Sequence, residues 1–316
     1  MKNGLDIAEQ YYHVHGVPMI ERNFGEYRDR IAAGLVGDGS ECFGFDDSLS
    51  RDHDWGPCFC LWLSKDVYEK IGPALQQEYE RLPKEFAGIP ARGESVWGGG
   101  RVGVFEIGAF YRQFIGRDDV PDTIDAWRKL PESNLAVCTN GRVFSDPAGE
   151  FTAVRNGLLA FYPQDVRLKK IASRCMTAAQ SGQYNYLRCI RRGEYVAAQY
   201  AETAFIRDII SLVFLLNKRY RPFYKWMHRS LAELPVLGGR IHDMLHELVT
   251  MHQHVRGEDV HWRKIDLIED IARQIIGEFR SMGLSCSESN FLLDHGPEIA
   301  ERIEDPGLRN ENVWVE

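Results

Sequence analysis

The sequence predicts an α+β protein in which a mixed β-sheet with helices on one side is followed by an all-helical domain. Apolar runs of strand length alternate with helical periodicity in the first half of the chain, and from Phe151 onward almost only helical patterns remain. The 316 residues are 44% hydrophobic and 27% charged, which leaves room for one large or two modest domains. We therefore expect a sheet domain over 1–150, a helical bundle over 151–282 and a C-terminal tail over 283–316.

Individual elements of the first domain follow from apolar spacing. From Gly4 to Ala33 apolar residues recur three or four apart, which predicts two helices divided near Pro18. The segments expected after them are a strand at Cys58–Leu63, a helix at Ser64–Leu82, a strand at Arg101–Ile107, short helices at Gly108–Ile115 and Thr123–Lys129, and a small hairpin at Cys138–Phe144.

The second half of the chain is expected to be helical throughout. Ile209 to Leu216 is apolar nearly all round, which is typical of the central helix of a bundle. The expected helices run from Pro163 to about Ser181, from Glu194 to Lys218, from Leu237 to His254 and from Lys264 to Met282. A loosely held acidic end is expected after a short helix in the tail.

Charge and cysteine content limit the classes of partner. Lys plus Arg number 38 against 46 Asp plus Glu, so the formal charge is -8 and no basic field is present to hold a nucleic acid. The longest apolar stretch is far shorter than the ~20 residues that cross a bilayer, so no membrane association is expected. Seven irregularly spaced Cys predict reduced thiols, and we expect a cytoplasmic protein.

A Gly-Ser turn and two aspartates precede the first buried strand. The turn Gly39-Ser40 offers backbone N–H groups and a hydroxyl that can hold phosphate oxygens. Asp52 and Asp54 follow after eleven intervening residues and project to the same side of an extended chain. Such a pair can hold Mg²⁺ between itself and substrate phosphates. The alternative for these residues is an ordinary solvated loop.

Glu106 is the candidate for a third carboxylate. It shares one face of its expected strand with Val102 and Val104. Three carboxylates can seat two Mg²⁺ ions, for which Mn²⁺ is an expected substitute, and two metals can clamp the attacking and leaving oxygens of a phosphoryl displacement. The alternative is a surface acid that forms a salt bridge at a strand end.

Basic and aromatic residues alternate from Lys218 to Trp226. Cations beside stackable rings suit a triphosphate and a base. The same arrangement can also be a helix C-cap, because the helix dipole favours cations there and Pro222 would end the helix. The nucleotide-binding candidates in this segment are Lys218, Arg221, Tyr224 and Lys225.

The residues from Gly39 to Pro57 (GSECFGFDDSLSRDHDWGP) resemble the family of domain of unknown function 4037 (DUF4037), within the polymerase-beta-like nucleotidyltransferase superfamily. Two further strings, Phe161–Lys170 and Lys218–Trp226, are similar to the same family, so the likeness spans roughly residues 35–230. The resemblance implies that Gly39 and Ser40 hold phosphate and that Asp52 and Asp54 bind metal. Glu106 would stand where the superfamily usually has Asp.

Together these observations predict a Mg²⁺-dependent transferase. It would move a nucleoside monophosphate from a nucleoside triphosphate, ATP being expected, to a hydroxyl of a small molecule or protein. The substrate would lie in a cleft between the two domains, since such clefts often bind small molecules. Two alternatives are a nucleotide-binding regulator without turnover and a metal-dependent phosphohydrolase that uses the same carboxylates.

Overall fold

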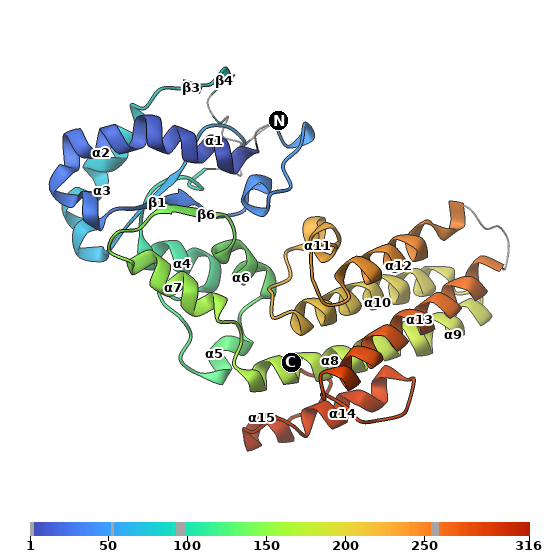
Figure 1. Ribbon diagram of the computed structural model, residues 1–316. Coiled ribbons are helices and arrows are strands. Elements are labelled where there is room, and N and C mark those ends of the chain that lie inside the picture. Colours follow the sequence, from blue (N-terminus) through green and yellow to red (C-terminus); the bar gives the residue numbers. More distant parts are fainter. Residues whose placement is uncertain (1–2, 52–53, 91, 93–98, 254–258) are drawn as a thin grey trace. The chain divides into compact units, whose positions relative to one another are not determined.

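The computed structural model describes all residues except 1–2, 52–53, 91, 93–98 and 254–258. The chain forms two compact units, the first comprising Met1–Asp122 with Leu130–Ala160 and the second Thr123–Lys129 with Phe161–Glu316 (Figure 1). The first unit holds a mixed sheet with helices and the second is helical, so the predicted α+β class is confirmed. The first unit continues to Ala160, past the residue 150 boundary expected from the sequence.

A four-stranded sheet forms the centre of the first unit. Its order is β5-β2-β1-β6. Strand β1 pairs antiparallel with both β2 and β6, whereas β2 and β5 are parallel. The strands are β1 (Ala32–Leu35), β2 (Cys60–Leu63), β5 (Gly103–Glu106) and β6 (Arg142–Ser145), and a separate small hairpin consists of β3 (Glu85–Phe86) and β4 (Ile89–Pro90).

Helices cover both faces of this sheet, so the expectation of helices on one side is wrong. Side chains alternate along β2, and Leu61 and Leu63 join the cluster formed with helices α1, α2 and α3. On the opposite face Trp62 stacks on Phe151 of α7, with ring centroids 3.8 Å apart. The helices of this unit are α1 (Gly4–Tyr11), α2 (Val17–Phe24), α3 (Lys65–Glu80), α4 (Ile107–Ile115), α6 (Glu132–Thr139) and α7 (Glu150–Leu159).

Two local expectations differ from the structure. The N-terminal segment is continuous helical backbone, in which the π-helical turn Tyr12–Gly16 joins α1 to α2 and places Pro18 in the first turn of α2, where proline is tolerated. The expected hairpin at Cys138–Phe144 is wrong. Helix α6 runs to Thr139, and β6 begins at Arg142 and pairs with β1, so the Asn-Gly turn links a helix to a strand.

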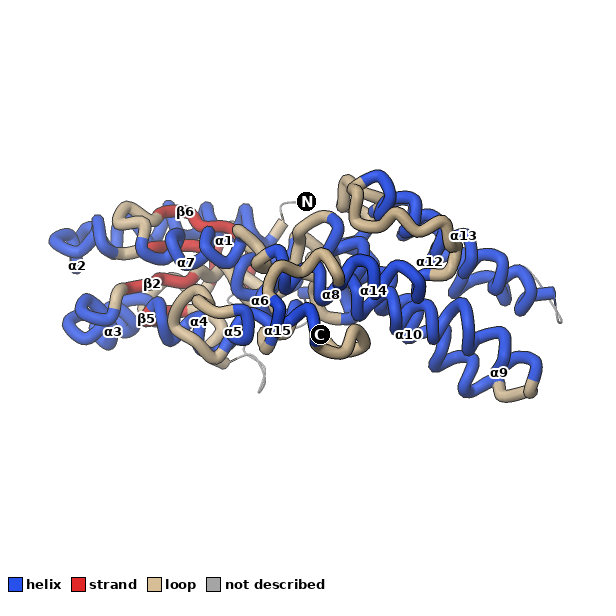
Figure 2. Tube along the Cα trace, turned by 90° about the horizontal axis from the view of Figure 1, so that it is seen from below, coloured by secondary structure: helices blue, strands red, loops and turns tan. Residues whose placement is uncertain are grey.

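The second unit is a helical bundle, and within the described residues strands occur only in the first unit (Figure 2). Helix α8 continues through the π-helical turn Ala179–Tyr186 into α9, and α10 packs along both α8 and this turn. The helices are α5 (Ile124–Arg128), α8 (Gln164–Ala178), α9 (Leu187–Arg191), α10 (Tyr195–Leu216), α11 (Tyr224–Leu231), α12 (Gly238–Thr250), α13 (Asp259–Ser281), α14 (His295–Ala300) and α15 (Pro306–Asn310).

The C-terminal segment packs on α8, which differs from the loosely held end expected from the sequence. Helix α14 contacts α8 directly. Leu292, Ile299, Ile303 and Leu308 are all at most 3% exposed. The carboxylate of Asp165 accepts hydrogen bonds from the backbone N–H groups of Glu304 and Asp305. Apolar burial and backbone hydrogen bonds therefore hold residues up to Leu308 in place.

None of the described helices is both long enough and apolar enough to span a bilayer.

A pair of helical glycines tests the packing of the second unit. A Cβ at Gly182 would lie 2.3 Å from the ring of Phe205 in α10, whereas a Cβ at Gly277 in α13 would meet nothing within 4 Å. We expect Gly182→Ala to lower the free energy of unfolding by ~1 to 3 kcal/mol through overpacking. Gly277→Ala should raise it by up to ~1 kcal/mol through helix propensity. Urea denaturation measures both, and equal effects of the same sign would contradict the α10 packing described here.

Candidate functional site

Antiparallel pairing of β1 with β2 places two loop segments at one edge of the sheet. Gly34, near the end of β1, is the register partner of Cys60, the first residue of β2. The chain that leaves β1 therefore starts beside the chain that enters β2. The first segment contains Gly39 and Ser40, and the second contains Asp54.

The side chain of Asn140 holds the backbone of the loop after β1, and in this loop the Glu41 carboxylate lies close to Gly39. The side chain of Asn140 accepts a hydrogen bond from Gly37 N–H and donates one to the Gly37 carbonyl. Gly39 precedes the 3₁₀ turn Ser40–Phe43, and a Cβ on Gly39 would lie 2.3 Å from the Glu41 carboxylate. A side chain at Gly39 would therefore displace the Glu41 carboxylate from its place against this turn.

Glu41 forms a buried ion pair that the sequence did not reveal. The residue is 4% exposed, and its Oε1 lies 3.4 Å from Nη1 of Arg92. Burial raises the pKa of the Glu41 carboxyl, and the Arg92 guanidinium opposes that shift. The same Nη1 lies 3.6 Å from Sγ of Cys58, two residues before β2. Arg92 therefore ties the Gly-Ser turn to the entry of β2.

Asp54 lies in the left-handed region of backbone conformation, with φ +52°. Asp tolerates this region better than most residues, and residues held there often mark functional sites. Its side chain is 9% exposed, and Oδ2 lies 3.7 Å from Nη1 of Arg101. Arg92 also interacts electrostatically with Asp54. Asp52, the other member of the expected metal pair, lies outside the described residues.

The arrangement brings some of the expected site residues together. Gly39, Ser40 and Asp54 belong to the two segments at this edge, and Glu41, Arg92 and Arg101 supply buried or half-buried charge around them. Among the residues that the structure describes, no group of three or more His, Cys, Asp or Glu is arranged to hold a metal ion. Asp54 is a carboxylate with an adjacent cation, so a metal that bound it would compete with Arg101.

Glu106 has a different environment from the one expected. Its Oε1 and Oε2 accept hydrogen bonds from the N–H groups of Gly108 and Ala109 at 2.8 and 2.7 Å. It is therefore the N-cap of α4. Because β2 and β5 are parallel and Glu106 pairs with Leu63, it lies at the end of these strands away from Asp54 and Arg101. The described residues do not bring Glu106 to Asp54.

In the second unit, Lys218 completes a helix C-cap. It has φ +51°, and N–H groups of Lys218 and Arg219 donate to the carbonyls of Leu215 and Phe214. This is a Schellman motif with Lys218 in the place that glycine usually takes. Helix α10 thus ends at Leu216, ahead of Pro222. Of the two alternatives given for this segment, the helix C-cap is the one that the backbone of Lys218 adopts.

The other basic and aromatic candidates lie around the start of α11. Tyr224 is 80% exposed, and Nζ of Lys225 lies 4.9 Å from the ring centroid of Trp226. Arg221 is partly buried, with Nη1 3.4 Å from Sδ of Met227. Tyr224 and Lys225 are exposed, as is Lys218, so their side chains are available to a ligand, whereas Arg221 is half-buried.

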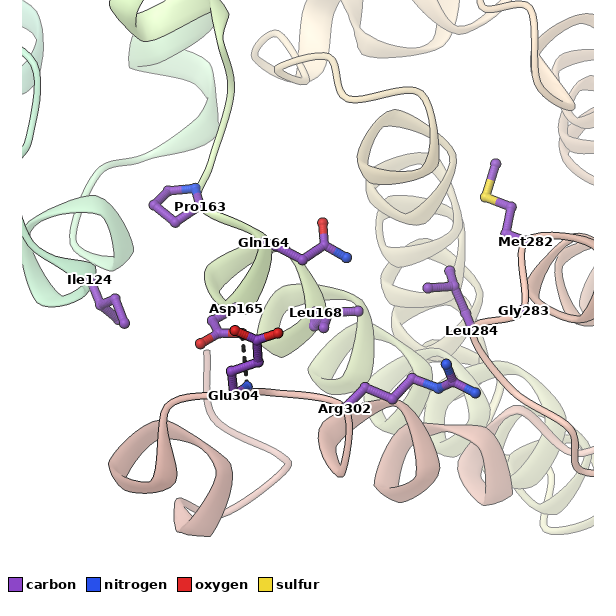
Figure 3. Close-up of a pocket in the computed structure, with 10 residues that line it drawn as sticks. All are labelled: Ile124, Pro163, Gln164, Asp165, Leu168, Met282, Gly283, Leu284, Arg302 and Glu304. Carbon is purple, nitrogen blue, oxygen red and sulfur yellow. Dashed lines mark hydrogen bonds between the residues drawn. The ribbon is translucent and has the colours of Figure 1, made fainter.

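A hollow of about 520 Å³ lies elsewhere in the second unit, beside the start of α8 (Figure 3). Asp165, Arg302 and Glu304 are among its lining residues, and the Asp165 carboxylate already accepts the Glu304 N–H there. Asp165 thus binds the C-terminal segment. None of the expected nucleotide or metal residues lines this hollow.

Residues 127–227 match the model of the family described as "Domain of unknown function (DUF4037)". This match confirms the resemblance to that family expected from the sequence. It contains the strings Phe161–Lys170 and Lys218–Trp226, whereas the Gly39–Pro57 string lies outside it.

Among solved structures, a nucleotidyltransferase-like protein from Exiguobacterium sibiricum 255-15 is similar, with 12% identity over 87% of this chain and 77% of that chain. The TM-score of this pair is 0.35. No curated protein matches the chain.

The role of Glu106 can be tested through stability. Glu106→Ala should lower the free energy of unfolding by ~1 kcal/mol because two N–H groups of α4 lose their acceptor. Glu106→Asp keeps a preferred capping residue and should retain most of that stability, as measured by thermal denaturation. A Glu106→Ala variant that is fully stable but has lost nucleotide turnover would place Glu106 with Asp54 after all.

Proposed function

We propose that the chain is a Mg²⁺-dependent nucleotidyltransferase that moves a nucleoside monophosphate from a nucleoside triphosphate, with ATP as the first candidate, to a hydroxyl of a small molecule or protein. The observation that supports this proposal is the antiparallel register of β1 with β2, because the segments that contain the Gly39-Ser40 turn and Asp54 both adjoin the same end of these strands. A phosphate-holding turn beside a carboxylate is what a metal-bound triphosphate requires.

In the proposed reaction each group of this chain has a limited task. Backbone N–H groups and the hydroxyl of the Gly39-Ser40 turn would bind phosphate oxygens. Asp54, together with Asp52, would hold Mg²⁺, or Mn²⁺ in its place. The metal would neutralise charge on the phosphates and on the leaving pyrophosphate. Positioning and charge neutralisation account for most of the catalysis in phosphoryl transfer, so two carboxylates and a turn are a sufficient minimum.

The second unit would supply the remaining contacts to the nucleotide. Lys225 and Tyr224 present an exposed cation and an exposed ring at the start of α11, and Arg221 and Lys218 lie in the segment before it. A triphosphate and a base could bind such residues by charged hydrogen bonds and stacking.

The products separate this proposal from its two alternatives. With water as a slow substitute acceptor, a nucleotidyltransferase releases pyrophosphate and nucleoside monophosphate in equal amounts. A phosphohydrolase that cleaves the terminal phosphate releases orthophosphate and nucleoside diphosphate. A regulator without turnover leaves the nucleotide intact, although the nucleotide raises its melting temperature. Chromatography of the products after incubation with Mg²⁺ and each nucleoside triphosphate distinguishes the three.

We expect Asp54→Asn to abolish pyrophosphate release while the protein stays folded. Asn tolerates positive φ, so the substitution removes the charge without adding backbone strain. The matched control is Asp38→Asn, which removes an exposed carboxylate from the segment that follows β1. Near wild-type turnover in Asp54→Asn, or an equal loss in both variants, would contradict the assignment of Asp54.

Lys225→Ala should raise the KM for the nucleotide by about ten- to a hundredfold, because the loss of a charged hydrogen bond costs ~1.5 to 3 kcal/mol. The control is Arg229→Ala, which removes another cation that faces the Trp226 ring. Steady-state kinetics and melting temperatures are compared for both. A lower melting temperature with an unchanged KM would leave Lys225 a purely structural role.

A further inference from the structure

Helix α8 presents a row of cations on one buried face. Lys169 and Lys170 are 1% and 4% exposed. Ser173 lies one helical turn after Lys169, and Arg174 lies one turn after Lys170. Nζ of Lys170 also lies 5.2 Å from the ring centroid of Tyr162. Long charged side chains are rarely buried unless something pairs with them.

The partner of this face is the last segment of the chain, residues 311–316. Nζ of Lys169 donates to the backbone carbonyls of Glu311 and Asn312 at 3.2 and 2.9 Å. The Ser173 hydroxyl donates to the carbonyl of Trp314. The Glu316 carboxylate then lies 2.6 Å from Nη2 of Arg174 and 3.8 Å from Nζ of Lys170.

This segment is held by polar contacts to the cations. Of residues 311–316 only Val313 is partly buried, and the other five are exposed. It has no regular helix or strand. By contrast, Leu308 just before it is 3% exposed. Glu311 is also anchored by an ion pair, with its Oε2 2.6 Å from Nη2 of Arg128. Residues 312–316 contribute little apolar burial and can leave α8 without disturbing the packing of α14 and α15.

The cations on α8 are only partly compensated by the segment. Burial lowers the pKa of the Lys169 ammonium, and the charge of the Glu311 carboxylate opposes that shift. The hydrogen bonds that Lys169 donates to this segment go to two backbone carbonyls. Arg174 is shared, since its Nε also lies 4.0 Å from Oδ1 of Asp208, a fully buried carboxylate. Nε of Arg174 also donates to the Ser211 hydroxyl at 3.3 Å. The segment itself supplies Lys169, Lys170 and Arg174 with two carbonyls and one carboxylate, and a ligand with several negatively charged oxygens could take the place of all three.

We propose that Lys169, Lys170 and Arg174 form a binding groove for a phosphate-bearing anion, and that residues 312–316 close this groove as a releasable autoinhibitory segment. The ligand chemistry is a chain of phosphates, either free or as part of a nucleotide. The groove lies within the second unit. Binding of an anion to the groove does not require Asp54 or Mg²⁺, so anion binding can be tested apart from the proposed transferase activity.

The test is calorimetric titration of the full chain and of a variant without residues 312–316 with inorganic pyrophosphate, in the absence of Mg²⁺. A site that is open about one-tenth of the time binds about tenfold more weakly than an open one. We expect the deletion to strengthen binding at least about tenfold. Adding Lys170→Gln to the deletion should abolish the gain, whereas adding Arg240→Gln, at an exposed position on α12, should preserve it.

A second variant keeps the test valid if the deletion unfolds the protein. Glu316→Gln retains the backbone contacts to Lys169 and removes the negative charge that faces Arg174 and Lys170. It should strengthen pyrophosphate binding by about threefold or more, which is less than the effect of the deletion because the segment would be open only part of the time. Unchanged affinity in the folded variants, or a gain that survives Lys170→Gln, would overturn the proposal. Titration with tripolyphosphate and with ATP then shows whether a nucleoside adds to the affinity of the phosphate chain.

Discussion

The pairing of β1 with β2 is the contact on which the candidate site depends. Gly34 in β1 has the carbonyl of Arg142 on one side and the ring of Trp62 on the other, and a Cβ there would lie 2.5 Å from that carbonyl and 3.0 Å from the ring. A side chain at this position would push β6 or β2 away from β1. The close approach permitted by Gly34 thus determines where the loop after β1 and the entry to β2 meet.

Two ion pairs then give these loops their shape. Glu41 and Arg92 are both nearly inaccessible, at 5% and 6% of the side chain, and removing one partner of such a pair costs ~3 to 5 kcal/mol. Asp54 and Arg101 form a more exposed pair. We interpret the first pair as structural support beneath the Gly-Ser turn. The second pair is the one that a metal-bound phosphate would alter, because Asp54 would exchange a cation for the metal.

Much of the fold could be predicted from local patterns. The apolar run before Ser64 is β2, and the helix expected over Glu194–Lys218 is observed as α10 (Tyr195–Leu216). The hairpin at Cys138–Phe144 failed because an Asn-Gly pair signals a turn without specifying that strands flank it. The sequence did not predict that helices cover the second face of the sheet. Phe151 in α7 covers that face by stacking on Trp62, and the two residues are far apart in the sequence.

The candidate site was only partly visible in the sequence. Gly39, Ser40 and Asp54 could be found because glycine and acid spacing is a local signal. Arg92 and Arg101 could not, since each binds an acid that is far away along the chain. Glu106 was correctly placed at a strand end, but a period of two does not show whether a carboxylate there faces a metal or caps the next helix.

Binding of Mn²⁺ measured by electron paramagnetic resonance, with α,β-methylene-ATP as a nucleotide that cannot release pyrophosphate, tests the central claim most directly. If Asp54 holds the metal of a bound triphosphate, Mn²⁺ should bind the wild-type protein more tightly when the nucleotide analogue is present. Asp54→Asn should remove that increase. Equal Mn²⁺ binding by the wild-type and Asp54→Asn proteins, with and without the analogue, would contradict the claim.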